Sequence, residues 1–162
     1  MVSYPEHLPS FDYIGVHRYF LTFCTFERRH HFANAEHVDL VRTQFAQQAD
    51  HEHFTIPAYC FMKDHVHLLA EGTREDSDLK HFVKMAKQYS GYYFKQRTEQ
   101  PLWQRYGFER VLRGEEGTWE IARYIVTNPV RSGLVTRLED YRFWGSLTHS
   151  REQLLEYIQR AA

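Results

Sequence analysis

Two histidines one residue apart, in the stretch KDHVHLLAEG (63–72), have the type and spacing to do chemistry. The stretch has the composition of a β-strand, where residues i and i+2 point to the same face. His65 and His67 would then project side by side. Neutral imidazole nitrogens are common ligands of divalent ions, so the pair could supply two ligands of a metal site. The alternative is two polar residues on the hydrated face of a sheet, because a chain with 11 histidines yields such a pair easily.

A second candidate group lies in the stretch RYIVTNP (123–129). Tyr124 and Asn128 are four residues apart, so on a helix they share one face. A tyrosine hydroxyl can act as a covalent nucleophile, and an amide oxygen one turn away can bind a hard cation. The segment could therefore deliver a nucleophile and a third metal ligand together. In the alternative interpretation, Tyr124 is an ordinary half-buried aromatic residue and Asn128 is a helix C-terminal cap.

Three other tyrosines, Tyr89, Tyr92 and Tyr93, are rival nucleophiles. Tyr92 is followed four residues later by Gln96, which gives a similar pairing of hydroxyl and amide. We expect this cluster instead to pack a long helix on the sheet.

The charge of the chain is unevenly distributed, although its net charge is only −1. Residues 1–79 hold 6 Lys and Arg against 12 Asp and Glu, whereas residues 80–137 hold 11 against 5. The basic segment is also rich in aromatic residues. Basic side chains can meet phosphates while aromatic rings stack on unpaired bases, so the segment could bind nucleic acid. A solvated helix face above core aromatics is the alternative.

The elements that must position these groups can be read from periodicity and turn signals. Strands are expected at 17–26, at 54–72 in two segments joined by a turn at Lys63-Asp64, and at 108–114. Helices are expected at 35–50, at 76–97 with Asp76 or Ser77 as N-cap, at 117–129 with Thr118 as N-cap, and at 151–161. Pro129 should end the third helix near Asn128. This order predicts an α+β fold, a ferredoxin-like sandwich with helices packed on an antiparallel sheet.

Length and composition favour one globular domain over residues 1–162. No charged-then-apolar leader and no apolar run of about 18 residues occurs, so we expect neither secretion nor membrane spanning. Cys24 and Cys60 lie in apolar stretches without the spacing of a zinc site. We expect them to be buried thiols in a reducing cytoplasm.

Together these stretches resemble the HUH single-stranded-DNA transposases with one catalytic tyrosine (IS200-like), and in particular the REP-associated tyrosine transposases. The resemblance covers roughly residues 11–147. The matching pieces, in the family's order, are YFLTFCTFERRHHF (19–32, a strand and an arginine-containing turn), YCFMKDHVHLLAEG (59–72, the HUH strand pair), PLWQRYGFERVL (101–112), ARYIVTNPVRSGLV (122–135) and EDYRFWGS (139–146).

The resemblance implies a role for each matching residue. His65 and His67 would be metal ligands, Tyr124 the nucleophile and Asn128 the third ligand of Mg²⁺ or Mn²⁺. Two positions depart from the family pattern. Asp64 stands where the family often has Asn, and Trp144-Gly145-Ser146 replaces a motif with paired serines.

The implied reaction is DNA transesterification through a 5′-phosphotyrosine, on single-stranded DNA that contains a hairpin, such as a REP element. The enzyme would be cytoplasmic, associated with the nucleoid when bound to DNA, and either a monomer or a homodimer that shares its tyrosine helices. The expected DNA contacts come from the basic segment and are Lys80, Lys84, Lys87, Lys95, Arg97, Arg105 and Arg110.

Other classes of protein fit the residues less well. A catalytically idle protein that binds DNA hairpins would not need intact His-x-His and Tyr-x-x-x-Asn sets. Metal-dependent barrel hydrolases also carry His-x-His, but 162 residues are too few for such a barrel. Two-histidine phosphoesterases need paired His-x-Thr/Ser motifs, which the chain lacks.

Overall fold

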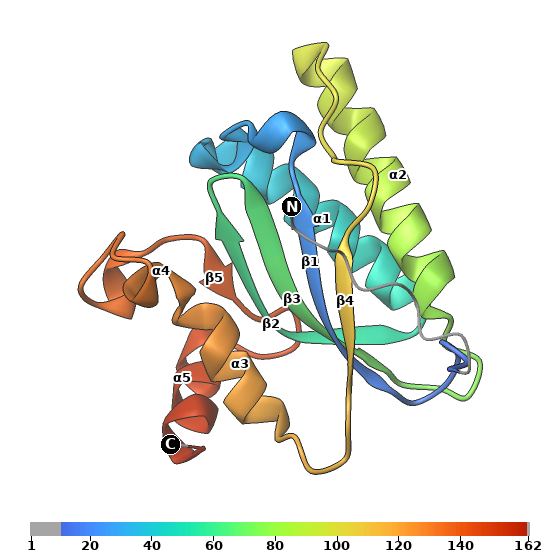
Figure 1. Ribbon diagram of the computed structural model, residues 1–162, viewed down its shortest axis with the longest axis vertical. Coiled ribbons are helices and arrows are strands. Elements are labelled where there is room, and N and C mark those ends of the chain that lie inside the picture. Colours follow the sequence, from blue (N-terminus) through green and yellow to red (C-terminus); the bar gives the residue numbers. More distant parts are fainter. Residues whose placement is uncertain (1–10, 162) are drawn as a thin grey trace.

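A computed structural model describes residues 11–161 of the protein, so the expected domain of residues 1–162 extends slightly beyond them. Its centre is a five-stranded antiparallel sheet with the strand order β4-β1-β3-β2-β5 (Figure 1). The strands are β1 (Arg18–Cys24), β2 (Phe54–Met62), β3 (His65–Gly72), β4 (Phe108–Leu112) and β5 (Trp144–Gly145). The first four have the order of a ferredoxin-like sandwich, which confirms the expected fold class.

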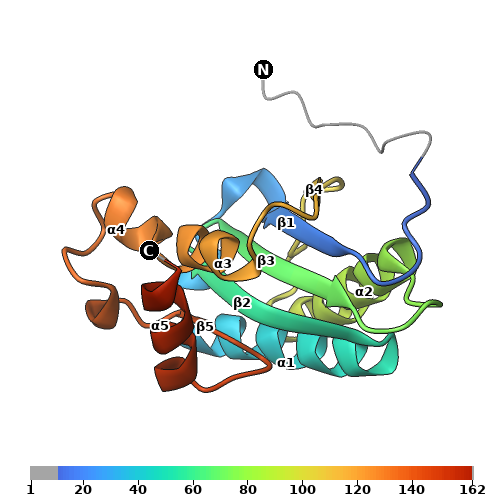
Figure 2. The same ribbon diagram turned by 90° about the horizontal axis from the view of Figure 1, so that it is seen from below.

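Helices connect the strands and follow them. They are α1 (Ala35–His51), α2 (Leu79–Thr98), α3 (Thr118–Val126), α4 (Asn128–Arg131) and α5 (Arg151–Arg160), with 3₁₀ turns at Phe26–Arg28, His31–Ala33 and Leu138–Asp140. Helices α1 and α2 cover one face of the sheet, α3 lies against the other, and α5 packs beside α3 near the β5 edge (Figure 2). Within residues 11–161, no helix combines the length and the hydrophobicity that a membrane span requires.

Side chains alternate between these two faces along each strand. In β3, Val66 and Leu68 enter the core beneath α1 and α2, whereas Leu69 packs in the second core, which Ala122 and Ile125 of α3 complete. His65 and His67 have the same parity as Leu69. The two histidines therefore lie on the face that α3 covers.

Helix α2 begins later than the sequence indicated. Its N-cap is Asp78, whose carboxylate accepts from the backbone N–H of His81 at 3.1 Å, so the expected caps Asp76 and Ser77 are wrong. Ser77 is buried and donates to the carbonyl oxygen of His53 at 2.7 Å. This tertiary bond occupies the hydroxyl that would otherwise cap the helix.

Helix α3 also departs from expectation at its start. Gly117 is its N-cap, and Thr118 uses its hydroxyl to donate to the carboxylate of Glu71 at 3.0 Å, so the expected Thr118 cap is wrong. The expected stop before Pro129 is confirmed, because α3 ends at Val126. A short helix α4 then starts at Asn128 with Pro129 in its first turn. Proline is tolerated there because a backbone N–H in the first turn has no partner within the helix.

The closing segment adds an edge to the sheet. Residues of β5 pair with Tyr59 and Cys60 of β2, and the indole of Trp144 is buried against α3 and α5. The hydroxyl of Tyr141 donates to the carbonyl oxygen of Phe61, near the end of β2. This segment, which departs from the family's paired serines, is therefore part of the hydrogen-bonded sheet.

Replacing Asp78 by alanine removes the α2 cap, and we expect the free energy of unfolding to fall by about 1 kcal/mol. Asp76→Ala is the matched control, because the exposed Asp76 carboxylate forms a surface ion pair with Arg74 and should matter by less than about 0.5 kcal/mol. Urea unfolding of both variants measures the difference. Equal losses would show that Asp78 does not cap the helix.

Candidate active site

The two histidines sit at the start of β3, between the strands on either side. In the antiparallel register His67 lies opposite Thr22 of β1 and Cys60 of β2, and His65 lies opposite Cys24 and Met62. The two imidazole rings have centroids 4.7 Å apart. The side chain of His65 keeps 18% of its surface exposed, so the pair is sheltered but open to a ligand.

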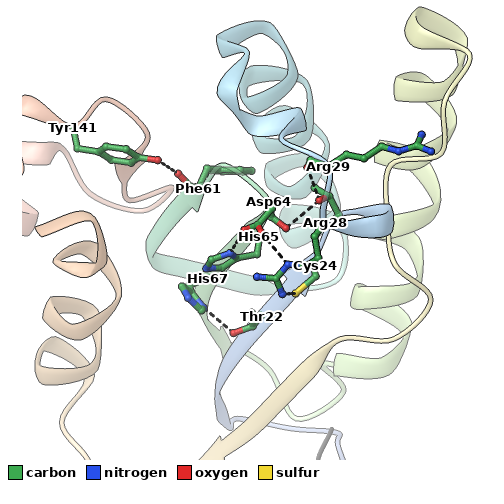
Figure 3. Close-up of polar contacts among 10 residues, drawn as sticks. Thr22, Cys24, Arg28, Arg29, Phe61, Asp64, His65, His67 and Tyr141 are labelled. Carbon is green, nitrogen blue, oxygen red and sulfur yellow. Dashed lines mark hydrogen bonds and ion pairs between the residues drawn. The ribbon is translucent and has the colours of Figure 1, made fainter. Parts of the chain in front are cut away.

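Each imidazole is held through its Nδ1 atom (Figure 3). His65 Nδ1 lies 2.7 Å from the Asp64 carboxylate, and His67 Nδ1 lies 2.7 Å from the hydroxyl oxygen of Thr22. Among residues 11–161 no hydrogen bond engages the Nε2 atom of either ring. Groups that hold the far nitrogen of a histidine are characteristic of metal ligands, because they fix the orientation of the ring.

Burial, with neighbouring positive charges, keeps His67 neutral. Burial, aided by the neighbouring His65, Arg131 and Arg28, lowers the pKa of His67 to about 3. Burial alone would raise the pKa of Asp64, but the hydrogen bonds from His65 and Arg28 outweigh it and lower that pKa. The site therefore presents an unprotonated imidazole beside an ionised carboxylate that fixes the second ring.

This donor set fits part of a divalent metal site. Two imidazoles leave most coordination positions open to phosphate and water, as a catalytic metal requires. The described residues contain no group of three or more His, Cys, Asp and Glu that could hold an ion. Any further protein ligand among these residues would be of another type, such as an amide.

Tyr124 lies on α3, over the same face of the sheet. The ring of Phe20 connects the two parts of the site, with its centroid 5.4 Å from that of His67 and 6.1 Å from that of Tyr124. Tyr124 is 56% exposed, so its hydroxyl is accessible to a large substrate. The structure thus brings Tyr124 and the histidines to one face, as a nucleophile beside a metal requires.

Arg131, which the sequence analysis did not single out, fixes the ring of Tyr124. Its guanidinium carbon lies 3.9 Å from the ring centroid, and its Nη1 donates to the Tyr124 carbonyl oxygen at 2.6 Å and to the Thr127 hydroxyl at 2.8 Å. A guanidinium stacked on an aromatic face restrains the ring. The seven-residue separation spans two helices, so no single-helix periodicity would have indicated the contact.

Asn128 is the first residue of α4 and is half-buried. Its side-chain amide makes no hydrogen bond within residues 11–161, so the amide oxygen is not committed elsewhere. Within the described part of the chain no hydrogen bond joins it to the histidines, and its role as third ligand stays a prediction.

The rival tyrosines lie on the wrong face. Helix α2 packs on the face opposite the histidines, and Tyr89, Tyr92 and Tyr93 are 39%, 57% and 41% exposed. The expectation that this cluster packs the helix on the sheet is wrong. Phe82, Ala86, Ser90 and Phe94, spaced by four, form the buried side of α2 and turn the tyrosines outward.

The seven expected DNA contacts occupy α2 and the segment up to β4, and six of them are exposed. Lys87 is the exception: its ammonium donates to the Gln104 carbonyl oxygen at 3.1 Å and lies over the rings of Phe23 and Trp103. Burial lowers the pKa of Lys87 to about 8. Lys87 therefore holds the segment after α2 in place, while the role of the other six in binding DNA stays a prediction.

Both cysteines are buried free thiols, as expected.

Comparisons with known proteins identify the family of the chain. The family model described as "Transposase IS200 like" matches residues 14–127. A candidate REP-associated tyrosine transposase of Haemophilus influenzae is 25% identical over 137 residues, which cover 77% of each chain.

Two solved structures are similar. A REP-associated tyrosine transposase bound to a REP hairpin has a TM-score of 0.72 at 21% identity, with 89% of this chain and 82% of that chain covered. A candidate transposase from Deinococcus radiodurans has a TM-score of 0.50 at 25% identity, covering 73% of this chain and 95% of the other. The first of these similarities extends the shared fold to most of the described residues.

The low pKa of His67 predicts how stability depends on pH. Between about pH 6.5 and about pH 3 the unfolded chain binds a proton at this residue that the folded protein does not, so the metal-free protein should lose stability as the pH falls through this window. His67→Gln should make the decline shallower. The free energy of unfolding in urea, measured with EDTA over the upper part of the window, gives both slopes.

His51→Gln is the control for this prediction, because the His51 side chain is 79% exposed. Its slope should match that of the wild type. If His67→Gln also had the wild-type slope, His67 would be shown to take up a proton as readily in the folded protein as in the unfolded chain.

Proposed function

Because the chain belongs to the IS200-like transposase family, we propose that it is a metal-dependent nuclease and strand transferase for single-stranded DNA, with Tyr124 as nucleophile. The observation that carries the proposal is the shared face: two imidazoles with free Nε2 atoms and an exposed tyrosine, joined by the ring of Phe20. An idle binding protein would have no use for this arrangement.

His65 and His67 would hold Mg²⁺ or Mn²⁺, with the amide oxygen of Asn128 as a third ligand. When bound, such an ion withdraws charge from a phosphate oxygen and orients the phosphate. Asp64 and Thr22 contribute by keeping both Nε2 atoms available.

Tyr124 would supply the reacting oxygen. Its Oη forms a bond to phosphorus as the phenolic proton leaves, and the bond from phosphorus to the 3′ oxygen breaks, which releases a 3′-OH and leaves a 5′-phosphotyrosine. The phosphodiester bond is exchanged and not hydrolysed, so a 3′-OH can reverse the step and join strands without ATP. Arg131 and Phe20 hold the ring of Tyr124, so its Oη has fewer conformations available before the attack. This restriction lowers the entropic cost of reaching the reactive geometry.

The substrate would be single-stranded DNA with a hairpin, such as a REP element. Two findings support this choice: the similarity to a candidate REP-associated transposase and the fold shared with a transposase bound to a REP hairpin. The exposed lysines and arginines of α2 and the following segment, together with the exposed rings of Tyr89, Tyr92 and Tyr93, suit contacts with phosphates and unpaired bases.

A covalent-adduct assay tests the proposal. The protein is mixed with labelled single-stranded hairpin oligonucleotides and Mn²⁺ or Mg²⁺ and then run on a denaturing gel. We expect a metal-dependent shifted band that disappears in Tyr124→Phe, because the nucleophile is lost, and in His65→Ala, because a metal ligand is lost.

Tyr92→Phe is the matched control and should keep the band, because Tyr92 lies on the opposite face of the sheet. A band that survives Tyr124→Phe would move the nucleophile to another tyrosine. Tight hairpin binding without an adduct, for any of the metals and hairpins, would favour the idle DNA-hairpin binder instead.

A further inference from the structure

We infer that Arg28 is a positioning residue of the site, which acts through Asp64 to fix the ring of His65. The inference rests on the proposed function, since it assigns His65 to a metal. It concerns the 3₁₀ turn Phe26–Arg28, which lies between β1 and α1.

Two contacts in series link Arg28 to His65 through Asp64 (Figure 3). Arg28 Nε donates to Asp64 Oδ2 at 3.0 Å, and the other carboxylate oxygen, Oδ1, lies 2.7 Å from His65 Nδ1. The guanidinium is itself fixed, because its Nη1 lies 2.9 Å from the sulfur of Cys24. Both oxygens of Asp64 are thus used, one toward Arg28 and one toward the histidine.

The backbone that presents Arg28 is strained. Glu27 and Arg28 both have positive φ angles, 53° and 56°, in the left-handed region that non-glycine residues rarely adopt. Such conformations cost free energy and persist only where their surroundings hold them, which occurs often at functional sites.

Thr25 holds this strained turn to the turn that carries Asp64. Its buried hydroxyl is 2.7 Å from the Arg29 carbonyl oxygen and 3.1 Å from the Asp64 carbonyl oxygen, and its N–H donates to that same Asp64 oxygen at 2.9 Å. On the far side, the Phe32 N–H donates to the Lys63 carbonyl oxygen at 3.0 Å. The two turns therefore form one unit, in which Arg28 has a fixed position relative to Asp64.

His65 depends on this unit more than His67 does. His67 is held by Thr22, a residue within the neighbouring strand, whereas His65 is held by a carboxylate in a two-residue turn at the edge of the site. Without Arg28, nothing else among residues 11–161 forms an ion pair with Asp64 apart from His65 itself. The carboxylate could then rotate away, and the His65 ring would lose the acceptor that leaves its Nε2 free.

The neighbouring Arg29 provides a matched control. It lies on the same turn and carries the same charge, but it pairs with Glu27 and Gln100, and it points away from the histidines (Figure 3). Arg28→Asn is the main variant, because asparagine tolerates the left-handed backbone while losing the guanidinium. Thermal unfolding identifies any variant that fails to fold, and Arg28→Lys, which keeps the charge without the planar fork, is the second variant.

The first test measures the metal-free protein. Nitrogen-15 NMR of the histidine rings reports which ring nitrogen carries the proton, and we expect His65 to be protonated at Nδ1 in the wild type and in Arg29→Ala. In Arg28→Asn we expect a mixture of the two tautomers. Wild-type His65 signals in Arg28→Asn would overturn the inference.

The second test measures the dissociation constant for Mn²⁺ by titration followed by electron paramagnetic resonance. Loss of a group behind a metal ligand typically weakens binding about 10- to 100-fold, so we expect Arg28→Asn and Asp64→Ala each to fall in that range and Arg29→Ala to match the wild type. The double variant should bind Mn²⁺ no more weakly than Asp64→Ala alone, because Arg28 acts through Asp64.

Additive losses in the double variant would overturn the inference, as would an unchanged Mn²⁺ affinity in Arg28→Asn combined with weaker DNA binding in EDTA, which would make Arg28 a DNA contact. Either result would leave the metal ligands of the proposed function in place and would reject only the role of Arg28. If His65→Ala bound Mn²⁺ as well as the wild type, the metal site of the proposed function would itself be wrong, and the inference would fall with it.

Discussion

The pairing register of β1, β3 and β2 is the constraint on which the rest of the structure depends. Because side chains alternate along a strand, a shift of one residue would turn His65 and His67 into the core beneath α1 and α2 and would move Val66 and Leu68 to the face that α3 covers. The apolar residues that make this shift costly are the same ones that aim the histidines at α3. The hydrophobic core and the candidate site are therefore specified by one pattern, and neither can change without the other.

The same register explains which side chains support the site. Thr22 can hold His67 only because it lies directly opposite it, and Phe20, two residues earlier on β1, is brought under α3 by the same alternation. The two turns at the ends of these strands place Arg28 and Asp64 within hydrogen-bonding distance of each other. The site is thus built from neighbouring strands and one helix end, with long-range contacts joining segments that are about 40 to 100 residues apart along the chain.

Sequence patterns predicted the parts of this arrangement that are governed by local periodicity. The strand pair, the shared face of His65 and His67, and the end of α3 before Pro129 follow from alternation and from the backbone restriction that proline imposes. The fold class follows from the order of these elements. The family resemblance then selected Tyr124 as the expected nucleophile among the tyrosines, a choice that composition and spacing alone had left open.

The parts that sequence did not predict all depend on tertiary competition. Ser77 and Thr118 are residue types that often cap helices. In the structure the Ser77 hydroxyl donates to the carbonyl oxygen of His53 instead, and the Thr118 hydroxyl donates to Glu71. The direction in which Tyr92 points depends on which face of α2 packs against the sheet. The sequence places apolar residues on both of the candidate faces, so it does not decide between them. Arg28 and Arg131 could not be found from local patterns, because each acquires its meaning only from a partner on another element.

The pairing of Arg28 with Asp64 has an electrostatic consequence for the site as a whole. An ionised carboxylate beside a metal would normally subtract one charge from the cation and repel a phosphodiester, but here the guanidinium cancels it at 3.0 Å. The proposed ligands, two imidazoles and an amide, would be neutral when they coordinate a metal. The pair of Arg28 and Asp64 therefore adds no net charge beside them, and the full charge of a bound dication would remain available to attract the backbone of a nucleic acid.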